Sequence, residues 1–116
     1  MAITQKHGVA NEALPRARAE LATLWRQALL GADEDARDFA AFSHSKQPSA
    51  ASELVHAGEK LTHLGERLLE ILSDIDAHIH PVVAGDIAAA RALCNAFMAI
   101  QQKNLAENRS AADAAR

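Results

Sequence analysis

Apolar residues recur at alternating intervals of three and four along the first third of the chain, which is the spacing of one face of an α-helix. The interval continues through Gly31 and Asp35 without a change of phase. The pattern therefore predicts one long helix over about residues 12–43. A bend at Gly31, or a separate helix that Asp33 begins as an N-cap, are the alternatives. The apolar row consists of Leu14, Ala17, Leu21, Leu24, Ala28, Phe39 and Phe42.

Two further apolar rows follow the same helical spacing. Pro48 lies in the turn before the first of them, and Pro81 lies between the two. They predict helices over about residues 50–76 and 85–109. The rows consist of Leu54, Ala57, Leu61, Leu64, Leu68, Leu72 and Ile75, and then of Val83, Ala90, Cys94, Phe97 and Leu105. The glycines Gly58 and Gly65 flank the first of these rows, and they predict a close approach by a neighbouring helix.

Three long amphipathic helices joined by short connections are typical of an all-α, up-down bundle. The 116 residues are expected to form a single domain, with a loose arm over residues 1–10 and a frayed tail over residues 110–116. Four large apolar residues lie outside the main rows, namely Leu29, Leu30, Leu69 and Ile100. Exposed residues of this kind predict that the bundle is completed by self-association, as a homodimer or a higher homo-oligomer.

Composition supports the helices and excludes several classes of function. Hydrophobic residues make up 49% of the chain but aromatic residues only 3%, so alanine and leucine supply most of the apolar surface. The net charge is −3 and basic residues are not clustered, which argues against nucleic-acid binding. The single cysteine, Cys94, fits a reducing compartment. No signal peptide or membrane span is evident, so we expect a soluble, cytoplasmic protein without membrane partners.

Several polar residues occupy positions where apolar ones are expected. Asp35 interrupts the apolar row of the first helix, and an unpaired buried carboxylate either loses solvation energy or stays protonated. Asp35 is therefore paired, functional, or exposed because the helix frays or bends at Gly31. On the third helix, Asp86, Gln101, Asn104 and Asn108 share one half of the surface with Ala90 and Phe97. This set predicts amide groups that face a ligand, a backbone carbonyl, a partner chain or water.

The histidines do not form a recognisable metal site. The spacing from Glu53 to His56 matches the Glu-x-x-His motif of di-iron bundles, which need it twice together with two further glutamates, and here it occurs once. His78 and His80 have no evident third ligand. We therefore expect solvated histidines, no bound metal, and a structural role for Cys94 in the core.

Two stretches resemble the family of folate cyclodeaminases and methenyltetrahydrofolate cyclohydrolases. The first is DEDARDF at residues 33–39, which resembles the family's helix motif D-x-D-A-x-x-F with matches at Asp35, Ala36 and Phe39. The second is residues 85–108, which resemble an alanine-rich helix of the family with two asparagines four residues apart. The matching residues of this second stretch are Asp86, Asn104 and Asn108.

The resemblance implies an all-helical oligomer that acts on or binds a methenyl- or formimino-tetrahydrofolate, with no other cofactor. In that family the aspartate of the motif faces the folate, so Asp35 would stabilise the amidinium cation and help to deliver water. The implied substrate-binding set consists of Asp86, Gln101, Lys103, Asn104 and Asn108. The sequence has Gly85 where the family has serine, and it lacks the family's glycine-rich loop P-T-P-G-G-G-S. This leaves open whether the chain is an enzyme or a non-catalytic ligand-binding or interaction protein.

Overall fold

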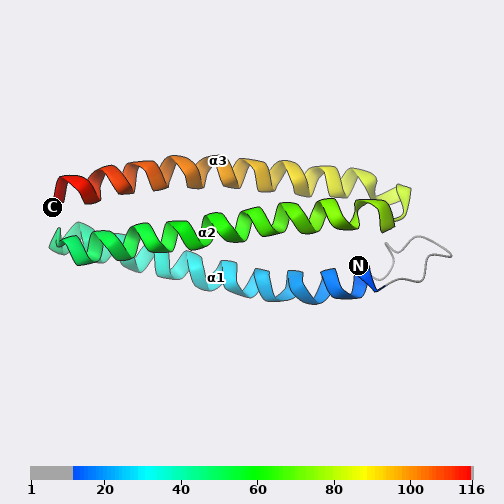
Figure 1. The fold of residues 1–116 in the computed structure, drawn as a ribbon, viewed down its shortest axis with the longest axis horizontal. Helices are drawn as coiled ribbons and strands as arrows, with labels where there is room; N and C mark the ends of the chain where they lie inside the picture. The colour runs from blue at the N-terminus through cyan, green and yellow to red at the C-terminus, as the bar shows by residue number, and fades with distance from the viewer. Residues whose placement is uncertain (1–11, 116) are drawn as a thin grey trace.

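The computed structural model describes residues 12–115, which are almost entirely helical. Three long helices follow one another: α1 (Ala13–Ser45), α2 (Pro48–Ile75) and α3 (Ala84–Ala115) (Figure 1). Two short 3-10 turns, η2 (Asp76–His78) and η3 (Pro81–Val83), connect α2 to α3. The predicted all-α bundle of three helices is confirmed.

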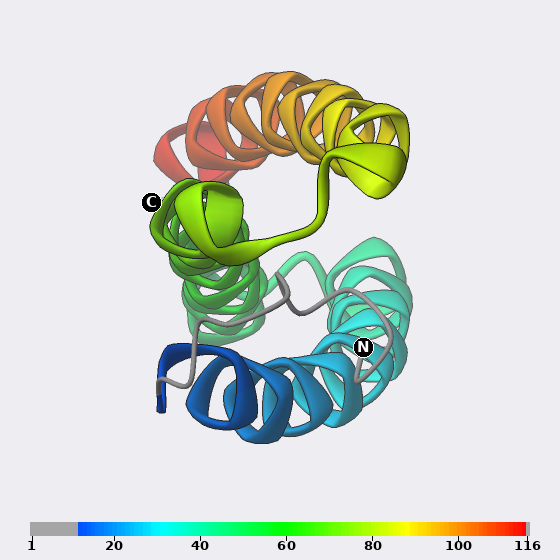
Figure 2. The ribbon, with the colours of Figure 1, turned by 90° about the vertical axis from the view of Figure 1, so that its right-hand side faces the viewer.

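The central helix of the fold is α2. It packs against both α1 and α3, whereas α1 and α3 scarcely contact each other. Seen along the long axis, the three helices are arranged as a C that is open between α1 and α3 (Figure 2). The chain measures 59 × 21 × 15 Å along its principal axes, so it is little thicker than one helix with its side chains, which is roughly 10–12 Å across. The molecule is therefore a curved layer of helices.

The first helix runs through Gly31 without interruption, so the alternative prediction of a separate helix beginning at Asp33 is wrong. The glycine instead permits close packing, because a Cβ atom at Gly31 would lie 2.8 Å from Cδ2 of Leu61 on α2. The helix ends at Lys46, whose backbone has a left-handed φ of 56° and whose N–H donates to the carbonyl of Phe42.

The predicted close approach at the glycines of α2 is confirmed, and the approaching helix is α3. A Cβ atom at Gly58 would lie 3.1 Å from Cδ1 of Leu105. A Cβ atom at Gly65 would collide with Sδ of Met98 and lie 3.1 Å from the ring of Phe97. These two glycines therefore set how closely α3 packs on α2.

The core consists of two clusters along the layer. The larger comprises Leu14, Ala17, Leu24, Leu64, Ile71, Leu72, Ile75 and Ile79, and the smaller comprises Phe42, Ala51, Leu54 and Ala112. The prediction that Phe39 belongs to the core is wrong, because Phe39 is 57% exposed on a side of α1 that no helix covers. Of the apolar residues predicted to lie outside the core, Leu29, Leu30 and Ile100 are exposed and Leu69 is half-buried.

The third helix extends to Ala115, so the predicted end at residue 109 and the frayed tail are wrong for residues 110–115. The extension is stabilised by packing, since Ala112 is only 3% exposed and contacts the smaller core cluster. The predicted N-terminal arm over residues 1–10 lies outside the described residues.

Candidate functional site

The side of the layer between α1 and α3 is not covered by any other described helix (Figure 2), and we call it the open face. Half-buried residues from the three helices and from η3 pack against the edge of the larger core cluster on this side: Leu21, Ala28, Leu68, Val83, Ile87, Ala90 and Cys94. Trp25 lies four residues after Leu21 and Leu93 lies three residues after Ala90, so both belong to the same side of their helices. Trp25 is 65% exposed and Leu93 is 73% exposed.

Asp35 belongs to the open face, because it lies seven residues after Ala28 on a continuous helix. Its side chain is half-buried. Burial, together with the negative charge of Asp38, raises the pKa of the Asp35 carboxyl above the 3.8 usual for aspartate. Among the described residues no cation forms an ion pair with Asp35. The carboxylate is thus held where its charge is unfavourable.

The contacts between helices place Asp35 at the same height along the long axis of the molecule as the C-terminal half of α3. Gly31 of α1 meets Leu61 of α2, and Leu105 of α3 meets Gly58, one turn earlier on α2. Because α1 runs antiparallel to α2, the turn of α1 that follows Gly31 lies beside Gly58. Asp35 is in that turn, so it is level with Leu105 across the open face.

The predicted substrate-binding residues of this half of α3 flank Leu105. Gln101 and Asn108 are half-buried, whereas Lys103 and Asn104 are exposed. Within residues 12–115 no hydrogen bond joins Asp35 to these side chains. Asp35 and the amide side chains of α3 therefore lie at the same height along the long axis of the molecule. They belong to two helices that do not pack against each other.

Asp86 is not part of that group. It is exposed in the first turn of α3, 18 residues before Asn104, which corresponds to about 27 Å along a helix. A single small ligand that contacts Asn104 cannot also contact Asp86 at this distance. An acidic residue in a first turn instead interacts favourably with the helix dipole.

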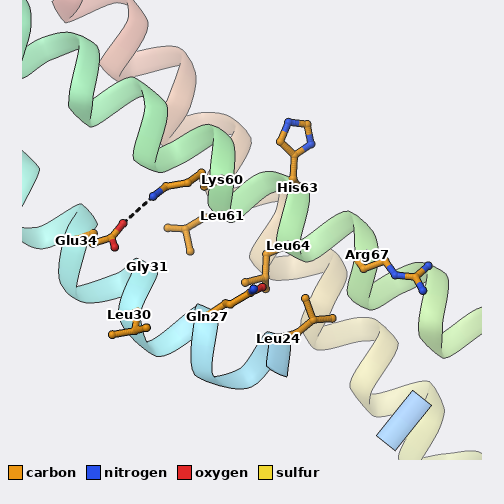
Figure 3. A pocket seen from close by; sticks show the side chains of 10 residues that line it. All are labelled: Leu24, Gln27, Leu30, Gly31, Glu34, Lys60, Leu61, His63, Leu64 and Arg67. Atoms are coloured by element: carbon orange, nitrogen blue, oxygen red, sulfur yellow. Dashed lines mark hydrogen bonds and ion pairs between the residues drawn. The ribbon is translucent and has the colours of Figure 1, made fainter. Parts of the chain in front are cut away.

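A groove of about 490 Å³ lies between α1 and α2 (Figure 3). Its lining consists of Leu24, Gln27, Leu30, Gly31, Glu34, Lys60, Leu61, His63, Leu64 and Arg67. Nζ of Lys60 donates to Glu34 at 2.8 Å, and this contact lowers the pKa of Glu34 and raises that of Lys60. The side chain of His63 is directed away from α1 (Figure 3). The charges of the groove are therefore paired across the two helices.

A second ion pair between the same helices involves Arg67. Its guanidinium donates to both carboxylate oxygens of Glu20, with an Nη2–Oε1 distance of 2.7 Å, and to Glu70 at 2.8 Å. The hydrogen bond from Arg67 lowers the pKa of Glu20. The pattern of α2 predicts Lys60 and Arg67 on its solvated side, and no local signal indicates their partners, which are 26 and 47 residues away.

The described residues offer little that resembles covalent or metal chemistry. Cys94 is half-buried, and burial raises the pKa of its thiol, which opposes the thiolate that a nucleophile requires. Residues 12–115 contain no group of three or more His, Cys, Asp or Glu side chains that could hold a metal ion. His56 is exposed, as predicted, and so is Glu53. Nδ1 of His80 accepts a hydrogen bond from the N–H of Val82 at 3.1 Å, which is a structural role.

We expected no stretch of the chain to approach a membrane span, but one helical segment does so in length and hydropathy. The segment Pro81–Ala115 is long and apolar enough to cross a membrane, judged by length and composition alone, and only 6% of its most apolar window is buried. Core helices of soluble proteins pass the same test, so a single such segment does not assign the chain to a membrane. It does emphasise how apolar the uncovered part of α3 is.

The fold and the open face define this chain as an all-α protein whose three helices form an incomplete bundle. No protein-family model, no curated protein and no solved structure matches the chain.

Proposed function

We propose that this protein is a helical interaction module that associates with a second copy of itself through the open face. The observation that carries the proposal is that α1 and α3 both pack on α2 and scarcely on each other. This leaves Trp25, Phe39 and Leu93 more than half exposed along one side of the layer. Full burial of a large apolar side chain contributes about 1.5–3 kcal/mol, which offsets part of the entropy lost when two chains associate.

The size of the open face suits a second copy of the chain. A layer that is 59 Å long and 21 Å wide offers a face on the order of 1,000 Å², whereas a standard interface buries about 800 Å² per partner. Apolar residues dominate this face, whereas the ion pair between Lys60 and Glu34 lines the groove between α1 and α2. A partner with an equally apolar face therefore fits better than a strongly charged one.

The test is the mass of the protein in solution, measured by sedimentation equilibrium over a wide concentration range. We expect a species of twice the 12.4 kDa chain mass that dissociates on dilution. Trp25→Ser should weaken association, whereas Leu30→Ser, an exposed residue that lines the α1–α2 groove, should not. A wild-type chain that stays monomeric at its highest soluble concentration would contradict the proposal.

Asp35 favours a second candidate function, the binding or hydrolysis of a methenyl- or formimino-tetrahydrofolate. A half-buried carboxylate with a raised pKa and no cation would be stabilised by the amidinium of a methenyl folate. Amide residues of α3 lie at the same level and would contact the pterin, as the family resemblance implies.

This second function is tested by the decay of methenyltetrahydrofolate, followed by absorbance. The wild type should accelerate decay, Asp35→Asn should remove most of the acceleration, and Asn104→Ala should reduce it. Binding of the folate without acceleration, detected by equilibrium dialysis, would identify a non-catalytic relative. Equal decay rates with and without protein, combined with no binding, would exclude a folate function.

A further inference from the structure

The open-face side of α1 carries a row of residues with the alternating four and three spacing of a coiled-coil seam. The row consists of Leu14, Arg18, Leu21, Trp25, Ala28, Ala32, Asp35 and Phe39. Leu14 is buried within the chain, and Leu21, Ala28 and Asp35 are half-buried. The remaining four members are exposed, so half of this seam has no partner helix within the described residues.

The row is complementary to itself when one copy is reversed. Counted outward from its centre between Trp25 and Ala28, each position on one side has a matching position on the other. In the two central pairs a large residue matches a small one, since Trp25 matches Ala28 and Leu21 matches Ala32. The next pair outward is Arg18 and Asp35, which are of opposite charge. The outermost pair, Leu14 and Phe39, joins two large residues. The complementarity of the three inner pairs is what a two-fold antiparallel helix pair requires.

We infer that α1 packs antiparallel on α1 of a second copy, about a two-fold axis between Trp25 and Ala28, with Arg18 of each copy against Asp35 of the other. This inference rests on the proposed self-association and adds the contact surface and its register. The proposed contact explains why Arg18 and Asp35 lie within an apolar row. An ion pair at a fixed position specifies one alignment of two otherwise apolar helices.

Both charged groups are available for this contact. Arg18 is exposed and Asp35 is half-buried, and neither forms an ion pair with another described residue. The cations that do pair with acids of α1, Lys60 and Arg67, are engaged by Glu34 and Glu20. A second copy therefore supplies the counter-charge that Asp35 lacks in the single chain.

Other alignments of the two α1 helices leave the charges unmatched. A shift of one heptad in either direction places Arg18 opposite Ala28 or Phe42. The second of these shifts also places Asp35 opposite Trp25. A parallel pair would place Arg18 against Arg18 and Asp35 against Asp35, which is repulsive. The antiparallel register centred between Trp25 and Ala28 is thus the one that matches both charge and side-chain size.

Charge exchange tests this register with the full-length chain. Arg18→Asp alone and Asp35→Arg alone each create two like-charge pairs in a homodimer, and each should raise the dissociation constant at least about tenfold. The double variant should restore wild-type association. An equimolar mixture of the two single variants should form a heterodimer, which native mass spectrometry separates from the homodimers by mass. Arg26→Asp is the matched control, since Arg26 is an exposed α1 residue outside the row.

The outcomes separate the register from the self-association itself. Restoration by the double variant and by the mixture, with helicity by circular dichroism unchanged, would support the register. If the wild type dimerises but Arg18→Asp associates as tightly as Arg26→Asp, the register is wrong and self-association still stands. A monomeric wild type would overturn both.

Discussion

Gly65 of α2 lies directly beneath Met98 of α3, so closely that a Cβ atom on Gly65 would collide with the methionine sulfur. The same Cβ atom would also meet the ring of Phe97 at 3.1 Å. This contact fixes the separation of α2 and α3, and thereby one edge of the open face.

Replacement of Gly65 by alanine should therefore destabilise the fold by about 1–3 kcal/mol, the usual cost of overpacking, despite the better helix propensity of alanine. Gly85→Ala is the matched control, because nothing lies within 4 Å of a Cβ atom at that position. It should be neutral or stabilise by up to about 1 kcal/mol. Urea unfolding of both variants checks the prediction, which equal losses at the two positions would contradict.

The ion pair between Glu20 and Arg67 should make stability depend on pH. Arg67 lowers the folded-state pKa of Glu20 below the usual 4.5. A carboxyl group with a lowered folded pKa stabilises the fold above its unfolded pKa, and this contribution is lost as the pH falls through the folded value. The stability difference between the wild type and Glu20→Gln should thus be present at pH 7 and vanish in acid. Thermal unfolding at a series of pH values measures it, and a difference that grows on acidification would refute it.

Asp35 should show the opposite pH dependence in the single chain. Its pKa is raised by burial and by Asp38, so the folded state favours the protonated carboxyl. At dilutions where the chain is monomeric, Asp35→Asn should be more stable than the wild type at pH 7. This advantage should shrink as the pH falls through the raised pKa, because the wild type then becomes neutral as well. Asp38→Asn, measured in parallel, should give part of the same gain by removing the neighbouring charge.

The last turns of α3 should contribute to stability. Removal of residues 110–116 deletes Ala112, which is 3% exposed against Leu54 and Phe42. We expect the truncated chain to lose about 1–2 kcal/mol of unfolding free energy, measured in urea. Ala114→Ser, at an exposed position of the same turns, should have almost no effect. A truncated chain as stable as the full one would show that these turns do not support the fold.

The number, order and approximate bounds of the helices were predictable from the apolar spacing alone. This succeeded because the spacing reports which side of each helix is buried, and a helix of about 30 residues repeats that signal many times. The close approach at Gly58 and Gly65 was predictable for a similar reason, since a side chain that is missing beside an apolar row leaves room for a neighbour. The end of α3 was not predictable, because alanine is compatible with both a frayed tail and a packed turn.

The candidate site was predictable only in part. The partial burial of Asp35 was predictable because a charge within an apolar row is a local anomaly. Arg18 and Trp25 were not predicted as site residues, because they belong to a second row that shares residues with the core row. This second row becomes apparent only once the uncovered side of α1 is known. The partners of Lys60 and Arg67 had no local signal, since each contact joins residues that are far apart in the chain.

The sequence by itself determined that this protein is a set of three amphipathic helices, because helix formation and the choice of the buried side depend on residues only three and four positions apart. The tertiary structure alone decided that α2 lies between the other two and that α1 and α3 remain apart. That arrangement depends on side-chain contacts between distant segments, such as Gly31 with Leu61 and Gly65 with Met98. It is also what leaves Asp35 and its apolar neighbours on the open face.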